Sequence, residues 1–175
     1  MKSINEIFSV KDKVILITGA SSGFGKHFAL TLSNAGAKII LSARRQEALD
    51  KLSKEIKNSG NESIAIPLDV SSNDSVTNLI KESESKMGHI DVLINNAGIS
   101  DPTWFKDLSE ENWLNVMETN LNGAFRVAKQ VSELMTRQER PGSIINIASI
   151  LGLRVGAQQT SYAVSKAGLT QLTKM

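Results

Sequence analysis

The stretch VILITGASSGFG, residues 14–25, decides the fold of this chain. It begins as a continuous apolar, β-branched run typical of a buried strand, passes into glycines at 19, 23 and 25, and continues as the helix-like sequence KHFALTLSNAG. Glycines allow a tight turn and a close approach to a ligand, and the free N–H groups at a helix start favour a phosphate. The stretch therefore predicts a strand, a dinucleotide-binding turn and a helix. A purely structural turn is the alternative, because the spacing G-x-x-x-G-x-G differs from the usual G-x-G-x-x-G.

Strand-like and helix-like segments alternate along the rest of the chain. We expect strands at 14–18, 38–42, 63–68, 91–95 and 143–148, and helices near 24–35, 46–58, 73–87, 109–136 and from about 161 onward. Continuously apolar strands in such an alternation predict an α/β fold with a Rossmann-like, doubly wound parallel sheet of strand order 3-2-1-4-5. This order would bring TGASSGFG, NNAG and Ser149 together at the carboxyl ends of the strands.

Tyr162 and Lys166 stand four residues apart in SYAVSKAGL, so a helix through them would place the ammonium near the phenol on one face. A free phenol has a pKa of about 10, and a neighbouring cation lowers the pKa of a phenol towards the pH at which proton transfer is efficient. The pair is a candidate acid–base group. A solvated pair on an exposed helix face is the alternative.

Six motifs together resemble the short-chain dehydrogenase/reductase family, from about Lys11 to the last residue. They are T-G-x-x-x-G-x-G at 18–25, Asp69-Val70, Asn95-Asn96-Ala97-Gly98, Asn120, Ser149 and Tyr162-x-x-x-Lys166. The resemblance implies an NAD(P)-dependent oxidoreductase that interconverts a carbonyl and an alcohol by hydride transfer. The alternative is a non-catalytic dinucleotide-binding or oligomerisation module left by truncation.

The resemblance also implies a role for each matching residue. Tyr162 would be the acid or base, Ser149 would hydrogen-bond the substrate oxygen, and Lys166 would hold the nicotinamide ribose and lower the phenol pKa. Asn120 would anchor a water that relays protons to Lys166. The expected cofactor-binding residues are Gly19, Ser21, Ser22, Gly23, Phe24, Gly25, Arg44, Asp69, Val70, Asn95, Ala97, Gly98, Tyr162 and Lys166. For Asn95 and Asn120, a structural role at a strand end or helix bend is the alternative.

The residues after the second predicted strand favour NADP over NAD. An acidic residue at this point binds the ribose of NAD, whereas an arginine accommodates the 2′-phosphate of NADP. The sequence reads Leu41-Ser42-Ala43-Arg44-Arg45, without a carboxylate, and a guanidinium suits a phosphate. The alternative is that both arginines are simply solvated.

The sequence says less about the substrate and the partners of the protein. Segments 99–105 and 150–159 would flank the nicotinamide, where Trp104, Phe105, Leu151, Leu153 and Val155 could form an apolar wall or belong to the core. The resemblance implies a small carbonyl or alcohol substrate. It also implies a homodimer or homotetramer that associates through the 109–136 helix and the helix near 161.

Composition limits the remaining possibilities. The chain has 175 residues with 41% hydrophobic and 22% charged residues, which fits one domain over 1–175. Its charge of +2 is scattered, so nucleic-acid binding gains no support, and without cysteine or metal-ligand histidine spacing we expect no metal. Segment 1–12 resembles neither a signal peptide nor an anchor, and we expect no membrane span and a cytoplasmic location.

Relatives continue past the Tyr–Lys helix with further strands and a substrate-covering lobe. Because this sequence stops at Met175, we expect the domain to be C-terminally incomplete relative to the family and the sheet to lack the family's last strands.

Overall fold

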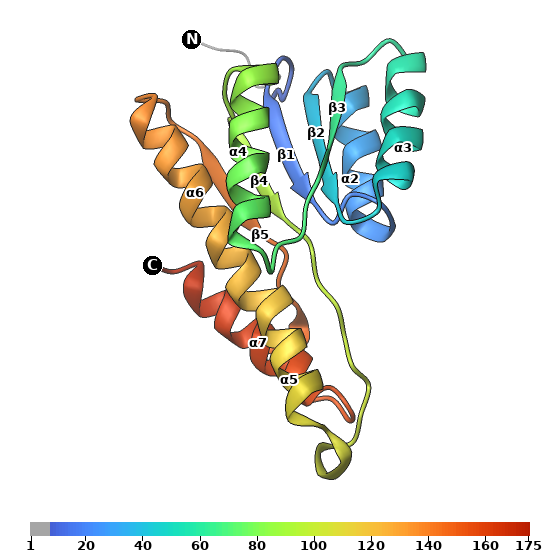
Figure 1. The fold of residues 1–175 in the computed structure, drawn as a ribbon, viewed down its shortest axis with the longest axis vertical. Coiled ribbons are helices and arrows are strands. Elements are labelled where there is room, and N and C mark those ends of the chain that lie inside the picture. The colour runs from blue at the N-terminus through green and yellow to red at the C-terminus, as the bar shows by residue number, and fades with distance from the viewer. Residues whose placement is uncertain (1–7) are drawn as a thin grey trace.

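The computed structural model describes residues 8–175 as a sheet with helices packed around it (Figure 1). The strands are β1 Val14–Thr18, β2 Lys38–Ala43, β3 Ser63–Pro67, β4 Val92–Asn95 and β5 Ser143–Asn146. The α-helices are α2 Gly23–Asn34, α3 Gln46–Asn58, α4 Asn73–Met87, α5 Glu110–Met117, α6 Gly123–Arg137 and α7 Thr160–Leu172. The short helical turns are η1 Phe105–Asp107, η2 Glu118–Asn122 and η3 Ile150–Gly152.

All strand pairs are parallel, and the strand order is β3-β2-β1-β4-β5, which confirms the expected 3-2-1-4-5 order. The register is set at the centre of the sheet, where Leu16 of β1 lies between Ile40 of β2 and Leu93 of β4. Because the strands run the same way, their carboxyl ends meet at one edge, which is the lower edge in Figure 1. The predicted motifs follow these ends.

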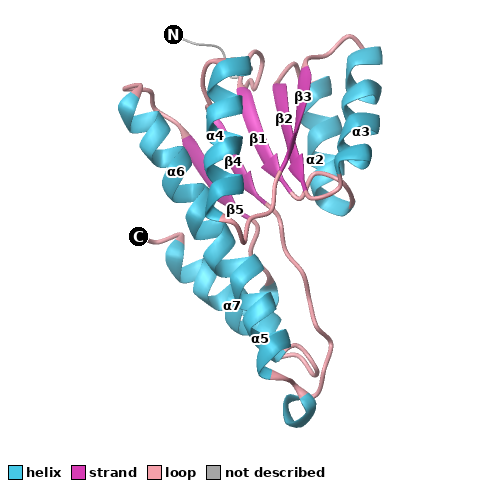
Figure 2. Ribbon diagram, viewed as in Figure 1, coloured by secondary structure: helices cyan, strands magenta, loops and turns pink. Residues whose placement is uncertain are grey.

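Helices cover both faces of the sheet (Figure 2). Alternate residues of each strand face opposite sides, so Leu16 packs with α4 and α6 while its neighbour Ile17 packs with α2 and α3. Burying each such side chain contributes about 1.5–3 kcal/mol relative to leaving it in water. The two resulting apolar clusters hold the strand ends in place beneath the site.

Strand β5 is the least covered strand. Ile144 packs against the α4/α6 cluster, but Ile145, on the opposite face, is 47% exposed. The strand also ends at Asn146, two residues before the predicted end at 148. One face of β5 is therefore open among the described residues.

The expected single helix over 109–136 is wrong, because the structure divides it into α5, the π-helical turn η2 and α6. The wide turn contains Asn120, whose side chain bonds the backbone of Ile99 on a distant loop. Immediately after it, Gly123 lies against Val70, where an added Cβ would approach a side-chain carbon of Val70 to 2.7 Å. Contacts with other segments thus interrupt a sequence that is helical by its own pattern.

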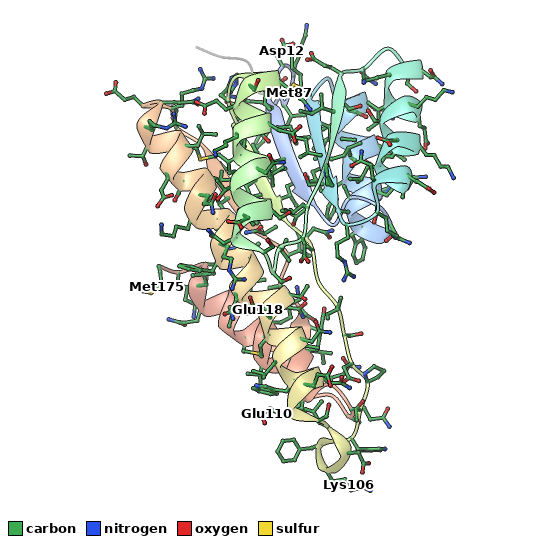
Figure 3. All side chains as sticks on the ribbon, in the orientation of Figure 1. Asp12, Met87, Lys106, Glu110, Glu118 and Met175 are labelled. Carbon is green, nitrogen blue, oxygen red and sulfur yellow. The ribbon has the colours of Figure 1, made fainter. Side chains whose placement is uncertain are left out.

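The loop after β4 runs beside α5 to the end of the molecule furthest from the sheet. Figure 3 labels Lys106 and Glu110 at this tip, and Asp12 and Met87 at the opposite end. Four residues of the expected apolar wall are largely exposed, namely Trp104, Phe105, Leu153 and Val155, so they are not core. Among residues 8–175, no helix combines the length and apolar character that a bilayer span requires. The first seven residues of segment 1–12 lie outside the described residues.

Candidate functional site

The larger cavity at the carboxyl edge of the sheet has a volume of about 690 Å³, within the range of small-molecule sites. It lies below the ends of β1 to β4. Its lining comes from the glycine-rich turn, from the loops after β2, β3 and β4, and from the α5–η2 junction: Gly19, Ser21, Ser22, Gly23, Ala43, Arg44, Arg45, Leu68, Asp69, Val70, Ser71, Asn96, Ala97, Gly98, Ile99, Asn115 and Thr119.

The glycine-rich turn and the NNAG loop are fastened to each other. The Thr18 hydroxyl accepts the backbone N–H groups of Asn96 and Ala97, each at 3.0 Å, and the Asn96 amide donates to the Thr18 carbonyl at 2.9 Å. A Cβ at Gly19 would lie 2.9 Å from the Ala97 Cα, so the approach requires glycine. Helix α2 starts at Gly23 with no acidic residue in its first turn, and its free N–H groups fit a pyrophosphate.

Two arginines, rather than one, line this cavity. The Arg45 guanidinium donates to the Ser21 hydroxyl at 3.1 Å and to the Ser22 hydroxyl at 3.3 Å, so it lies across the glycine-rich turn. Arg44, the cofactor-binding residue predicted from the sequence, lines the same wall, and both side chains are exposed. Arg45 was missed as a site residue, although its position beside Arg44 was a usable signal.

Asp69 lies at the adenine end of the expected site. Its carboxylate accepts the hydroxyl of Ser71 at 2.6 Å and the backbone N–H of Ser71 at 3.0 Å. These two bonds, led by the hydroxyl, lower the pKa of Asp69 below its usual value, with a smaller contribution from Arg44. The carboxylate is therefore ionised at neutral pH beside the buried Val70.

A second cavity of about 320 Å³ adjoins the first, and the two share Asn96, Gly98 and Ile99. Its lining includes both Tyr162 and Lys166 from α7, together with Phe24, Ser100, Ile147, Ala148 and Gln159. The structure thus brings the predicted acid–base pair to the end of the predicted dinucleotide groove. Phe24 lines this second cavity, whereas Ser22 and Gly23 of the same turn line the larger one.

Lys166 is held under the protein surface, with 4% of its area exposed. Its Nζ donates to the Ile147 carbonyl at 2.6 Å and lies 5.7 Å from the centroid of the Tyr162 ring. Burial lowers the pKa of the Lys166 ammonium. The Lys166 side chain is therefore buried beside the phenol, and the alternative of a solvated pair does not fit this burial.

The Asn120 side chain is fully buried and fully bonded. Its Oδ1 accepts the Ile99 N–H at 2.8 Å, and its Nδ2 donates to the Ile99 carbonyl at 2.9 Å and to the Ser165 hydroxyl at 3.0 Å. Asn120 therefore joins the wall shared by the two cavities to the helix that carries Tyr162 and Lys166. Its expected role in a water relay stays a prediction.

Three other predicted residues do not line either cavity. Ser149 follows Ala148, which lines the second cavity. The Ser149 hydroxyl accepts the Leu151 N–H at 3.2 Å. Asn95 is buried and donates to the Ala124 carbonyl and the Asn146 side chain, which fits the structural alternative, whereas its neighbour Asn96 faces the groove. Gly25 is buried against the Gly19 carbonyl.

A doubly wound parallel sheet with its cavity at the switch point between β1 and β4, beside a glycine-rich helix start, defines a dinucleotide-binding domain of the Rossmann type. The profile of the family described as short chain dehydrogenase matches residues 13–175. The chain belongs to the short-chain dehydrogenase family.

Known proteins agree with this assignment. A 3-oxoacyl-(acyl-carrier-protein) reductase of Synechocystis sp. is 41% identical over 163 residues, which cover 93% of this chain and 66% of the relative. A short-chain type dehydrogenase/reductase from Mycobacterium marinum superposes with a TM-score of 0.94 at 34% identity, over 98% of this chain and 68% of that one. A short chain dehydrogenase/reductase from Burkholderia phymatum, solved in complex with NAD, gives 0.91 at 30% identity, over 95% and 59%. The chain thus spans about two thirds of the length of the curated relatives it matches.

Proposed function

We propose that this chain forms the cofactor-binding and proton-transfer part of an NADP-linked oxidoreductase that interconverts a carbonyl and an alcohol. One observation carries the proposal: Tyr162 and Lys166 line a cavity that joins the dinucleotide cavity at Asn96, Gly98 and Ile99. A dinucleotide in the larger cavity can therefore present its reactive end to the phenol.

The nicotinamide, when bound, supplies or accepts the hydride. The Tyr162 hydroxyl donates a proton to the carbonyl oxygen in reduction, and its phenolate takes the alcohol proton in oxidation. Lys166, whose Nζ lies 5.7 Å from the centroid of the Tyr162 ring and which lines the same cavity, would hold the nicotinamide ribose. The Ser149 hydroxyl accepts the Leu151 N–H, so its own hydrogen can be donated to the substrate oxygen. Asn120 would anchor the water that relays protons to Lys166.

Two features support NADP as the cofactor. Arg44 and Arg45 both line the cavity after β2, where the 2′-phosphate of NADP would lie, and no carboxylate stands at this strand end. The bonds from Arg45 to Ser21 and Ser22 hold one guanidinium at the turn before any phosphate arrives. The two guanidinium groups can bind the 2′-phosphate of NADP, which NAD lacks, and they do not repel NAD.

The substrate class we propose is a 3-oxoacyl thioester. It rests on the names of the similar reductases and on exposed apolar side chains that could contact an acyl chain. Phe24 lines the second cavity, and Ile150 and Leu153 are exposed on the 150–159 segment that is expected to flank the nicotinamide. The same names favour an enzyme over a non-catalytic module.

Association between copies is part of the proposal. Leu114 of α5, Phe125 of α6 and Val164 of α7 are exposed apolar residues on the helices through which the family resemblance implies a dimer or tetramer. Light scattering of the purified protein would establish the oligomeric state. A cytoplasmic location stays a prediction.

The test is Tyr162→Phe, which keeps the ring and removes the transferable proton of the only tyrosine in the chain. We expect turnover of a 3-oxoacyl thioester with NADPH to fall about a hundred- to ten-thousand-fold, the range of general acid–base catalysis, while the dissociation constant of NADPH stays within about twofold. Reduction at the parent rate would contradict the mechanism.

A further inference from the structure

Ser165 is a fully buried hydroxyl that lies one position before Lys166 on α7. Its Oγ donates to the Tyr162 carbonyl at 2.7 Å and accepts the Asn120 amide at 3.0 Å. It contacts neither the phenol nor the ammonium in these bonds. It is, however, the point at which Asn120 is attached to the helix that carries both groups.

Counting hydrogens fixes the direction of these bonds. A serine hydroxyl has one hydrogen, which goes to the Tyr162 carbonyl, so the bond with Asn120 requires an N–H donor from the amide. The Ile99 N–H likewise requires the amide oxygen, at 2.8 Å. The Asn120 amide can therefore adopt only one of its two flipped orientations, and both of its hydrogens are used, on Ile99 and Ser165.

We infer that Ser165 is a positioning residue that sets the distance between the cofactor wall and the Tyr162–Lys166 pair. Through Asn120 it links three segments: the loop after β4 at Ile99, the π-helical turn η2, and α7. The backbone at Gly98 packs closely against Asn120 and Lys166, because a Cβ on Gly98 would lie 3.3 Å from the Asn120 Oδ1 and 3.7 Å from the Lys166 Nζ. This inference rests on the proposed function.

Replacing the hydroxyl should release this link without removing any reacting group. In Ser165→Ala, one amide hydrogen of Asn120 has no partner in a buried site, so the amide gains by moving away. The Ile99 N–H then loses a well-placed acceptor, and the wall shifts relative to the phenol. Since a displacement of about 1 Å near the chemistry can lower a rate a hundredfold, we expect kcat to fall about ten- to a hundredfold. KM for the thioester and the dissociation constant of NADPH should change less than about threefold.

Ser161→Ala is the matched control. Ser161 lies on the same helix and is also fully buried, but its hydroxyl has no hydrogen-bond partner among the described residues. We expect the kcat of Ser161→Ala to equal that of the parent protein. Ser165→Thr, which keeps a hydroxyl that can bond back along the helix, should restore most of the activity lost in Ser165→Ala.

Amide hydrogen exchange at Ile99, resolved by NMR, gives a readout that does not depend on turnover. Ile99 lies far from Ser165 in sequence, so a purely local effect on α7 would not reach it. We expect Ile99 to exchange at least about tenfold faster in Ser165→Ala than in the parent or in Ser161→Ala. Unchanged exchange at Ile99 would overturn the link, and faster exchange with parental kcat would overturn its role in the reaction.

Failure of this inference can be told apart from failure of the proposed function. If the parent protein binds NADPH but reduces no thioester, the proposed activity is wrong, and faster exchange at Ile99 in Ser165→Ala still supports the link. If the parent is active and Ser165→Thr loses as much protection and activity as Ser165→Ala, side-chain volume rather than the hydroxyl matters, and the inference fails.

Discussion

Gly25→Ala and Gly23→Ala should separate the stability of the glycine-rich turn from its function. A Cβ at Gly25 would lie 2.4 Å from the Gly19 carbonyl oxygen and 2.6 Å from the Asn96 amide nitrogen. Both are closer than atoms can approach, and the first belongs to the backbone. The amide is itself held by the Thr18 carbonyl at 2.9 Å, so neither neighbour can move freely. We predict that Gly25→Ala lowers the free energy of unfolding by about 2–3 kcal/mol, the upper part of the range for overpacking.

Gly23 lies in a different environment two residues earlier. An added Cβ would meet nothing within 4 Å, although the backbone has the left-handed φ of +54°. Alanine in this conformation costs about 1–2 kcal/mol, offset by about 0.4–1 kcal/mol from the smaller freedom of the unfolded chain. The expected loss of stability is therefore about 1 kcal/mol. Because Gly23 lines the larger cavity and no protein atom lies within 4 Å of an added Cβ, we predict that alanine there weakens NADPH binding at least about tenfold.

The assay pairs urea and thermal unfolding with calorimetric titration of NADPH and of adenosine 2′,5′-bisphosphate. For a domain of this size, a change of 1 kcal/mol corresponds to about 2–4 °C in Tm, so Gly25→Ala should unfold about 4–12 °C below the parent and Gly23→Ala about 2–4 °C below it. If Gly23→Ala proves the less stable variant, or binds NADPH as the parent does, the steric account of the turn is refuted.

Two further predictions concern charge. Arg44→Ala and Arg45→Ala should each weaken NADPH about tenfold more than NADH, and Arg44→Asp should shift preference towards NAD; a parent that already prefers NADH in the same titrations would contradict the cofactor assignment. Asp91, which accepts the Val14 N–H at 2.9 Å, should be worth about 2–4 kcal/mol to the folded state, as judged by urea unfolding of Asp91→Ala at neutral pH. Burial alone raises the pKa of Asp91, but the Val14 N–H and the Lys13 charge outweigh burial and hold that pKa below 3.8. The contribution of Asp91 to the free energy of unfolding should therefore be present above pH 3.8 and disappear as the pH falls through the lowered pKa. A pH dependence in this range that is the same in the parent and in Asp91→Ala would contradict the assignment.

The sequence predicts the sheet well because the sheet depends on local patterns. Each strand is a short apolar run and each crossover a helix, and with right-handed connections few strand orders remain. The site motifs follow for the same reason, since turns after parallel strands must meet at one edge. Lys166 and Tyr162 likewise meet because four residues span one helical turn.

The details that escaped prediction depend on contacts between distant segments. The π-helical turn arises where Asn120 bonds Ile99, and no window of sequence around 109–136 contains that partner. The choice between Asn95 and Asn96 depends on the last residue of β4, because successive side chains face opposite ways at a strand end. The contacts of Arg45 depend on how the neighbouring turn brings Ser21 and Ser22 within reach of α3.

The irregular turn accompanies the Asn120–Ile99 bonds, and the same bonds hold a wall of the candidate site. A regular helix through Glu118–Asn122 would keep each backbone N–H bonded four residues back, and it would rotate every later residue of α6 relative to α5. The extra residue in the turn lets Asn120 reach the loop after β4 while Val127 and Val131 still face the sheet core. Because Ile99 lines both cavities, the bonds between Asn120 and Ile99 also hold the wall that the larger cavity shares with the cavity of Tyr162 and Lys166. A regular helix through this region would lose either the core contacts of α6 or the bonds between Asn120 and Ile99.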